Sequence, residues 1–162
     1  MKRNYTHIFF DLDHTLWDFE ANARNTLEEL FVTLKLEERG VNDFEQFYQN
    51  YLVHNDKLWE RYRKGYIKQD ELRVKRMRLS LLDFKIADEA LAQAMNVQFL
   101  ELLPTRKIVF PHTMEILDYL REKNTNYISL QMVLKKCSIT NSGIPDSRTI
   151  LNTSSLQKAP TA

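Results

Sequence analysis

Apolar residues recur at helical spacing through the middle of the chain, from Asp18 to about Leu103. Four stretches each carry a stripe with i, i+3, i+4, i+7 character, which predicts four amphipathic helices and no strand. The stripes are Leu27, Leu30, Phe31 and Leu34; Phe44, Phe47, Tyr48, Tyr51, Leu52, Leu58, Trp59 and Tyr62; Leu72, Met77, Leu79 and Leu82; and Leu91, Met95, Phe99 and Leu102. We expect a small bundle in which the aromatic stripe belongs to the core.

Residues that start or stop helices separate these stripes. A carboxylate just before a stripe accepts hydrogen bonds from free helix amides, which predicts helix starts at Asp43, Asp70 and Asp88. Glycine or proline just after a stripe predicts its end, as at Gly40, Gly65 and Pro104.

The two flanks of the helical region have another pattern. The run Ile8–Phe10 is continuously apolar, as in a buried strand of a parallel sheet. After the helical region, Val109 and Phe110 lead into a stripe of Met114, Ile116, Leu117 and Leu120. The chain is therefore expected to return to the same core with a helix, and Pro111 is expected near its first turn.

Two carboxylates, Asp11 and Asp13, end the apolar run and are followed by Thr15. Ligands of open α/β sheets bind at the carboxyl ends of the strands. Carboxylates are costly to bury there unpaired, so the pattern favours a site around a cation. The plainer interpretation is an aspartate-rich turn in which Asp13 caps the segment that follows.

The segment from Phe9 to Phe19 resembles motif I of the haloacid dehalogenase-like hydrolases. It is most similar to their phosphatase branch with a helical cap inserted after motif I, which includes pyrimidine 5′-nucleotidase-type enzymes. The resemblance implies an α/β fold with a Rossmann-like core, incomplete here, and an inserted four-helix cap. Residues 1–17 and 104–123 would form the partial core, and residues 18–103 the cap.

The resemblance also implies roles for the motif residues. Asp11 would be the nucleophile, and Asp13 would protonate the leaving oxygen and later activate water. A Mg²⁺ cofactor would be held by the Asp11 carboxylate and the Asp13 main-chain carbonyl. Thr15 would support the loop through its hydroxyl, and His14 would be an ordinary loop residue.

Two arginines are candidate substrate contacts in the implied cap. The runs Leu58–Ile67 and Leu72–Arg76 resemble the cap of the same branch, whose role is to close over the site and select the substrate. Arg73 and Arg76 would face an anionic substrate, or else belong to a solvated basic face.

The composition of the chain bears on which partners it can bind and on the cellular compartment it suits. The 23 basic and 22 acidic residues nearly balance, which gives no electrostatic reason to expect a nucleic acid polymer as partner. No apolar stretch is long enough to cross a membrane. One cysteine, Cys137, cannot form an internal disulfide and fits a cytoplasmic location.

The composition changes after Lys123. In residues 124–162, Asp146 is the only acid and Tyr127 the only aromatic residue, so this tail is expected to be non-native or disordered. The resemblance requires a Ser/Thr-Asn-Gly phosphate motif, a lysine and an acidic pair, which are missing from their expected places. Thr140 and Lys158 are weak substitutes.

A shifted reading frame would explain this change. Codons read one base upstream from Lys123 permit the string Lys-Tyr-Lys-Leu-Tyr-Ile-Ile-Thr-Asn-Gly, which resembles the missing strand and phosphate motif. We therefore expect a phosphohydrolase of small phosphomonoesters, nucleoside monophosphates among them, that is inactive in this short form. The alternatives are a short phosphatase with residual activity through Thr140 and Lys158, or a non-catalytic helical binding module.

The frame hypothesis makes a prediction about the coding DNA. A single-base change near codon 123 should open a longer frame that encodes the phosphate motif, and farther on the lysine and acidic pair. Sequencing the coding region tests this. If no single-base change there opens such a frame, the hypothesis is wrong.

Overall fold

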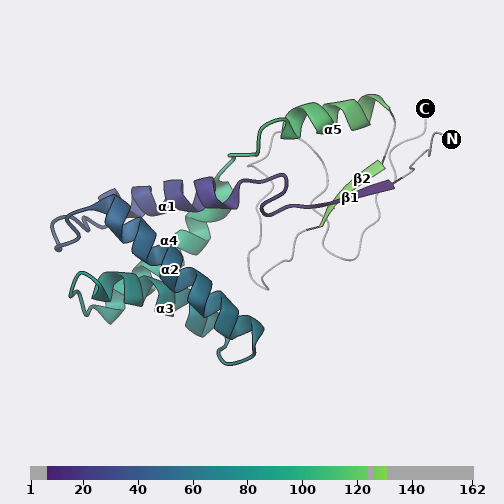
Figure 1. The fold of residues 1–162 in the computed structure, drawn as a ribbon. Helices are drawn as coiled ribbons and strands as arrows, with labels where there is room; N and C mark the ends of the chain where they lie inside the picture. Colours follow the sequence, from purple (N-terminus) through teal and green to yellow (C-terminus); the bar gives the residue numbers. More distant parts are fainter. Residues whose placement is uncertain (1–6, 124–125, 131–162) are drawn as a thin grey trace. The chain divides into compact units, whose positions relative to one another are not determined.

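The structure, a computed structural model, describes residues 7–123 and 126–130, with side chains from Ile8 to Lys123. The chain divides into two compact units, and Figure 1 labels their elements. We call residues 1–22 with 105–162 the sheet unit, and residues 23–104 the helical unit. The second range lies close to the cap range expected from the sequence, residues 18–103. Among the described residues, no helix has the length and apolar character that crossing a lipid bilayer requires.

The sheet unit contains a parallel pair of strands. β1 (His7–Asp11) pairs with β2 (Asn126–Leu130), and Ile8 stands opposite Tyr127 while Asp11 stands opposite Leu130. α5 (Thr113–Glu122) precedes β2 and lies against it (Figure 1). Because the strands are parallel, their carboxyl ends lie at the same edge, and Asp11 is the residue at that edge.

β2 corrects part of the prediction for the tail. It lies inside the stretch 124–162, so residues 126–130 form a strand and are not disordered, while the non-native origin of the tail stays a prediction. Tyr127, Ile128 and Leu130 are residue types that suit a pleated strand, although the surrounding composition is polar. The rest of the predicted tail, with Thr140 and Lys158, lies outside the described residues. The incompleteness of the Rossmann-like core therefore stays a prediction.

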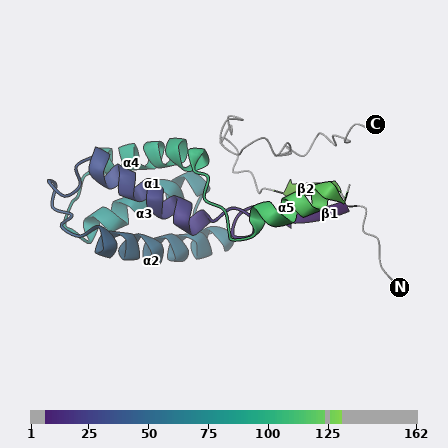
Figure 2. The ribbon, with the colours of Figure 1, turned by 90° about the horizontal axis from the view of Figure 1, so that it is seen from above.

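All four helices predicted for the middle of the chain are present. They are α1 (Phe19–Thr33), α2 (Phe44–Arg63), α3 (Gln69–Leu82) and α4 (Glu89–Leu102), seen from above in Figure 2. α2 packs on α3, and α3 packs on α4. The largest fully buried side chains in the helical unit are mainly stripe residues: Leu27, Leu30, Leu36, Val41, Phe47, Tyr51, Leu72, Met77, Leu81, Met95 and Phe99.

The sequence predicts that the first helix ends at Gly40. In the structure, α1 already ends at Thr33. The chain turns at Lys35, whose φ is 53°, and the amide of Leu36 donates to the carbonyl of Phe31. Leu36 and Val41 are fully buried beyond the helix end. Burial of these two side chains therefore favours a compact loop, and Gly40, at φ 111°, belongs to that loop.

Asp43 and Asp88 cap their helices as expected, while Asp70 does not. The Asp88 carboxylate accepts from the amide of Leu91 at 2.9 Å, at the start of α4. α3 begins after Lys68, so Asp70 lies within its first turn, where a negative charge still suits the helix dipole. Pro111 is expected near the first turn of the helix that follows it. It lies just before α5, with His112 between Pro111 and the helix.

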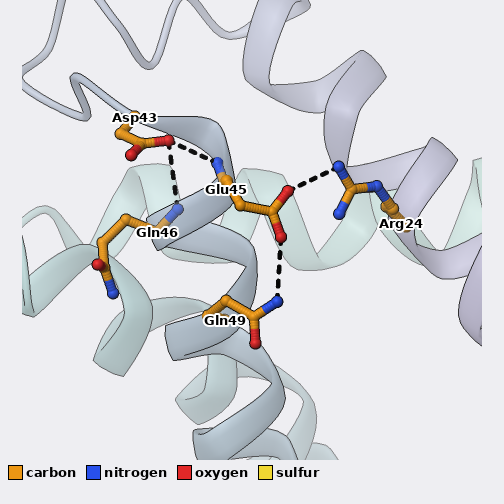
Figure 3. A network of polar contacts seen from close by, with 5 residues as sticks. All are labelled: Arg24, Asp43, Glu45, Gln46 and Gln49. Atoms are coloured by element: carbon orange, nitrogen blue, oxygen red, sulfur yellow. Dashed lines mark hydrogen bonds and ion pairs between the residues drawn. The ribbon is translucent and has the colours of Figure 1, made fainter.

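The start of α2 is tied to α1 by a polar network (Figure 3). Asp43 accepts from the amides of Glu45 at 2.8 Å and Gln46 at 3.3 Å. The Glu45 carboxylate accepts from Arg24 of α1 at 2.7 Å and from Gln49 at 3.0 Å. The cap satisfies free amides of α2, and the exposed ion pair links α2 to α1.

We predict that Asp43→Ala lowers the free energy of unfolding by about 1 kcal/mol, since two amides of α2 lose their acceptor. Chemical denaturation with tryptophan fluorescence measures this. Asp43→Ser is the matched control, because its hydroxyl can still accept, and it should remain close to the wild type. Equal losses in both variants would contradict a capping role for Asp43.

Candidate active site

The two carboxylates singled out in the sequence lie at the carboxyl end of β1. Asp11 is the last residue of the strand and is exposed, and Asp13 lies two residues farther on and is partly buried. In an extended chain, residues two apart point to the same side. The exposed Asp11 is therefore open to a reaction partner, with Asp13 beside it.

A tight loop holds these carboxylates in place. The carbonyl of Leu12 accepts from the amides of Leu16 at 3.0 Å and Trp17 at 2.9 Å, and from Thr15 at 3.4 Å. The amide of His14 donates to the carbonyl of Trp17 at 3.1 Å, and His14 takes a φ of 60°. His14 therefore serves the turn geometry, as expected of a loop residue. Thr15 is exposed, and the role of its hydroxyl stays a prediction.

The Asp13 carboxylate is electrostatically strained. Its Oδ1 atom is buried and has no hydrogen-bond partner. Burial raises the pKa of Asp13 above its ordinary value, and the nearby negative charge of Asp11 raises it further, while His14 opposes the rise. A partly desolvated carboxylate beside another carboxylate is stabilised by a bound proton or by a cation.

The acidic pair suits part of a magnesium site. Carboxylate and carbonyl oxygens are the ligands that Mg²⁺ takes in proteins, and the unpartnered Oδ1 of Asp13 marks a place where positive charge is favourable. Within the part of the chain that the structure describes, no group of three or more His, Cys, Asp or Glu side chains gathers to hold a metal. Asp11 and Asp13 would therefore supply only part of the coordination shell.

Arg73 and Arg76 lie in the helical unit, and their burial makes the solvated basic face wrong for both. Arg73 is 9% exposed and Arg76 is 4% exposed. Arg76 donates to Asn55 Oδ1 at 3.0 Å, and its guanidinium lies 4.9 Å from the ring centre of Phe99 and 5.6 Å from that of Tyr51.

Arg73 contacts its own helix. It pairs with Asp70 at 3.5 Å, one helical turn away. The Nε atoms of both Arg73 and Arg76 are buried without a hydrogen-bond partner. Both guanidinium groups are thus largely shielded from solvent, and a contact with substrate would require them to be uncovered.

Sequence reasoning missed three residues that hold the loop from its far side: Trp17, Asn22 and Thr113. Each donates a side-chain hydrogen bond to a backbone carbonyl more than 80 positions away in the sequence. The position of Asn22 in the helical pattern could have indicated that this residue is buried. It lies four residues before Thr26 and eight before Leu30, so it is a polar residue on the buried face of α1.

The raised pKa of Asp13 gives a pH-dependent prediction. The folded state binds this proton more tightly than the unfolded chain does, whose aspartates titrate near about 3.9. The resulting stabilisation is present below that pH and is lost as the pH rises through the folded pKa. At pH 7, Asp13→Asn should therefore raise the melting temperature, and the gain should shrink as the pH falls towards 4.

Thermal unfolding in buffer with EDTA measures this gain without interference from metal. Asp56→Asn is the control for the loss of one negative charge, because Asp56 is exposed on α2. A gain that does not depend on pH, or a lower melting temperature at pH 7, would show that Asp13 carries no burial penalty.

Comparison with known proteins adds a sequence match and a fold match. The chain is 37% identical over 68 residues to the pyrimidine 5′-nucleotidase PynA of Streptococcus pneumoniae, which covers 42% of the chain and 27% of PynA. Its fold is similar to that of the putative HAD-hydrolase YfnB of Bacillus subtilis, solved bound to magnesium, with a TM-score of 0.68 and 18% identity. That likeness covers 80% of the chain and 53% of YfnB.

These matches are partial. The chain spans about a quarter of the nucleotidase and about half of the YfnB chain, and no family model matches it. Both relatives nonetheless point to the family that motif I indicated. The local sequence match and the shared fold together support the resemblance to the haloacid dehalogenase-like superfamily.

Proposed function

We propose that this chain carries the nucleophile and the general acid of a phosphohydrolase that acts on small phosphomonoesters, nucleoside monophosphates among them. The observation that carries the proposal is the exposed Asp11 at the carboxyl end of β1, with the partly buried Asp13 two residues beyond it. The family relationship supports hydrolase chemistry, and the nucleotidase relative supports this substrate class.

Asp11 would attack the phosphorus of the substrate. One carboxylate oxygen forms a bond to phosphorus while the bond to the ester oxygen breaks, which leaves an aspartyl-phosphate and a released alcohol. Its exposure allows this approach, and the hydrogen-bonded loop behind it limits its movement. When bound, Mg²⁺ would offset the repulsion between the carboxylate and the phosphate.

Asp13 would move the protons of both half-reactions. It gives its proton to the departing ester oxygen, and then takes a proton from the water that attacks the aspartyl-phosphate. A carboxyl group with a buried oxygen that has no competing hydrogen bond suits this exchange. Because Asp13 lies two residues from Asp11, the proton donor would stand next to the nucleophile.

The helical unit would act as the cap. It has its own core, with fully buried leucine, methionine and aromatic side chains. A cap that closes over the site would exclude water and so strengthen the electrostatic contacts of the transferring phosphoryl group.

The 162-residue chain alone should turn over phosphomonoesters slowly or not at all. Each missing group that would stabilise phosphoryl charge typically costs ~10²–10³ in rate. The described residues offer no third acidic side chain beside Asp11 and Asp13.

We predict that the protein encoded by the longer frame hydrolyses p-nitrophenyl phosphate and nucleoside monophosphates in the presence of Mg²⁺. Asp11→Asn should abolish this turnover, because an amide is a poor nucleophile. Asp13→Asn should lower kcat mainly for substrates with basic leaving groups, and less for p-nitrophenyl phosphate, whose leaving group needs little protonation.

Steady-state kinetics on both leaving groups test these effects, with Asp56→Asn as the control. Full activity in Asp11→Asn would overturn the proposal. Rapid Mg²⁺-dependent hydrolysis by the 162-residue chain itself, sensitive to Asp11→Asn, would favour the residually active alternative. Binding of neither Mg²⁺ nor beryllium fluoride by the longer protein would favour a binding module.

A further inference from the structure

The loop that carries Asp13 is joined to a segment that returns to the sheet unit much later in the sequence. The amide of Asp18 donates to the carbonyl of Ile108 at 3.1 Å, and the amide of Phe110 donates to the carbonyl of Leu16 at 3.0 Å. Trp17 lies between these two bonds and makes an antiparallel bridge with Val109. We call residues 106–110 the return segment.

Asn22 extends this pairing with its side chain. Its Nδ2 group donates to the carbonyl of Ile108 at 2.7 Å, and its Oδ1 accepts from the amide of Ile108 at 3.0 Å. Nδ2 also donates to the carbonyl of Asp18 at 2.6 Å. The side-chain amide thus pairs with both backbone groups of Ile108, as a neighbouring strand residue would.

Because Asn22 is buried, loss of these hydrogen bonds would be costly. The residue is fully buried, and a buried amide is costly unless its donors and acceptor are paired. Both donors and the oxygen of Asn22 are paired within the sheet unit. One end of the loop is therefore fixed to the return segment at Asp18 and Ile108.

Thr113 fixes the same loop at a second point. Its hydroxyl donates to the carbonyl of Leu16 at 3.1 Å, so this carbonyl accepts from both Thr113 and the amide of Phe110. Thr113 is 4% exposed and is the first residue of α5. The loop is thereby connected to the start of a helix that lies against β2.

We propose that Asn22 and Thr113 are positioning residues for the carboxylates of the β1 loop. Their hydrogen bonds reach backbone atoms of Leu16, Asp18 and Ile108. They act on Leu16 and Asp18, and Trp17 between these residues accepts the hydrogen bond of His14, the immediate neighbour of Asp13. The catalytic consequence rests on the proposed function, whereas the anchoring of the loop does not.

Amide hydrogen exchange on the full 162-residue chain, without metal or substrate, tests the anchoring. Asn22→Leu keeps the size of the side chain and removes its polar contacts. The amide of Ile108 should exchange faster because it loses its acceptor. The amides of His14, Asp18 and Phe110 keep their acceptors, and they should still exchange at least tenfold faster, because the loop opens more often.

Two comparisons make the test specific. Asn96→Leu removes another buried asparagine, in α4 of the helical unit, and should leave the exchange of His14, Asp18 and Phe110 unchanged. Thr113→Val loses only the hydroxyl and should accelerate Phe110, while Thr113→Ser should restore slow exchange. If Asn22→Leu accelerates Ile108 alone, or if the valine and serine variants of Thr113 behave alike, the proposal is wrong.

Failure of the proposed function would look different. In that case Asp11→Asn would leave turnover by the longer protein intact, while the exchange pattern above would still be observed. If both proposals hold, Asn22→Leu in the longer protein should lower kcat at least tenfold with a smaller change in KM, because the bound substrate meets a loop that is less often in place.

Discussion

The structure depends on hydrogen bonds between two segments that the sequence separates by a whole helical unit. Asn22 and Ile108 are 86 positions apart, yet the side chain of one pairs with both backbone groups of the other. The chain leaves the sheet unit before residues 23–104 and re-enters it after them, and the two segments that flank this insertion meet at one place. The bonds from Leu16 and Asp18 to the return segment provide that place.

The same constraint accounts for the electrostatic environment of the acidic pair. A loop that is fixed at several backbone atoms keeps Asp13 partly buried beside Asp11, where a freely moving loop would let both carboxylates reach water. The cost appears as a raised pKa and as a buried Oδ1 without a partner. Such a cost is common at sites that bind a cation or move a proton. The chain is similar to proteins named as hydrolases, which agrees with a site of this kind.

Much of this organisation could be predicted from residue patterns. The stripes predicted four helices, and the starts at Asp43 and Asp88 follow from local capping. The end of α1 and the start of α3 were misplaced, because burial of Leu36 and Val41 and the turn at Lys35 involve contacts beyond the local sequence.

Some residues of the candidate site could be predicted from the sequence, and others could not. Asp11 and Asp13 stand in a short continuous motif, which a single sequence displays directly. Asn22 shows locally only as a polar residue on a buried helix face. The long-range bonds of Asn22 to Ile108 and of Thr113 to Leu16 are not encoded by any local spacing. The burial of Arg76 against Phe99 and Tyr51 is equally non-local, since a helix of mixed charge gives no sign of which arginine turns inward.

The most direct test of the central claim is to trap the covalent intermediate on Asp11. The longer protein would be mixed with Mg²⁺ and a phosphomonoester, quenched, and treated with borohydride, which reduces an acyl phosphate but not a free carboxylate. Peptide mass spectrometry would then locate the reduced residue. We expect homoserine at position 11 and unmodified Asp13. Reduction at another residue, or none during active turnover, would contradict it.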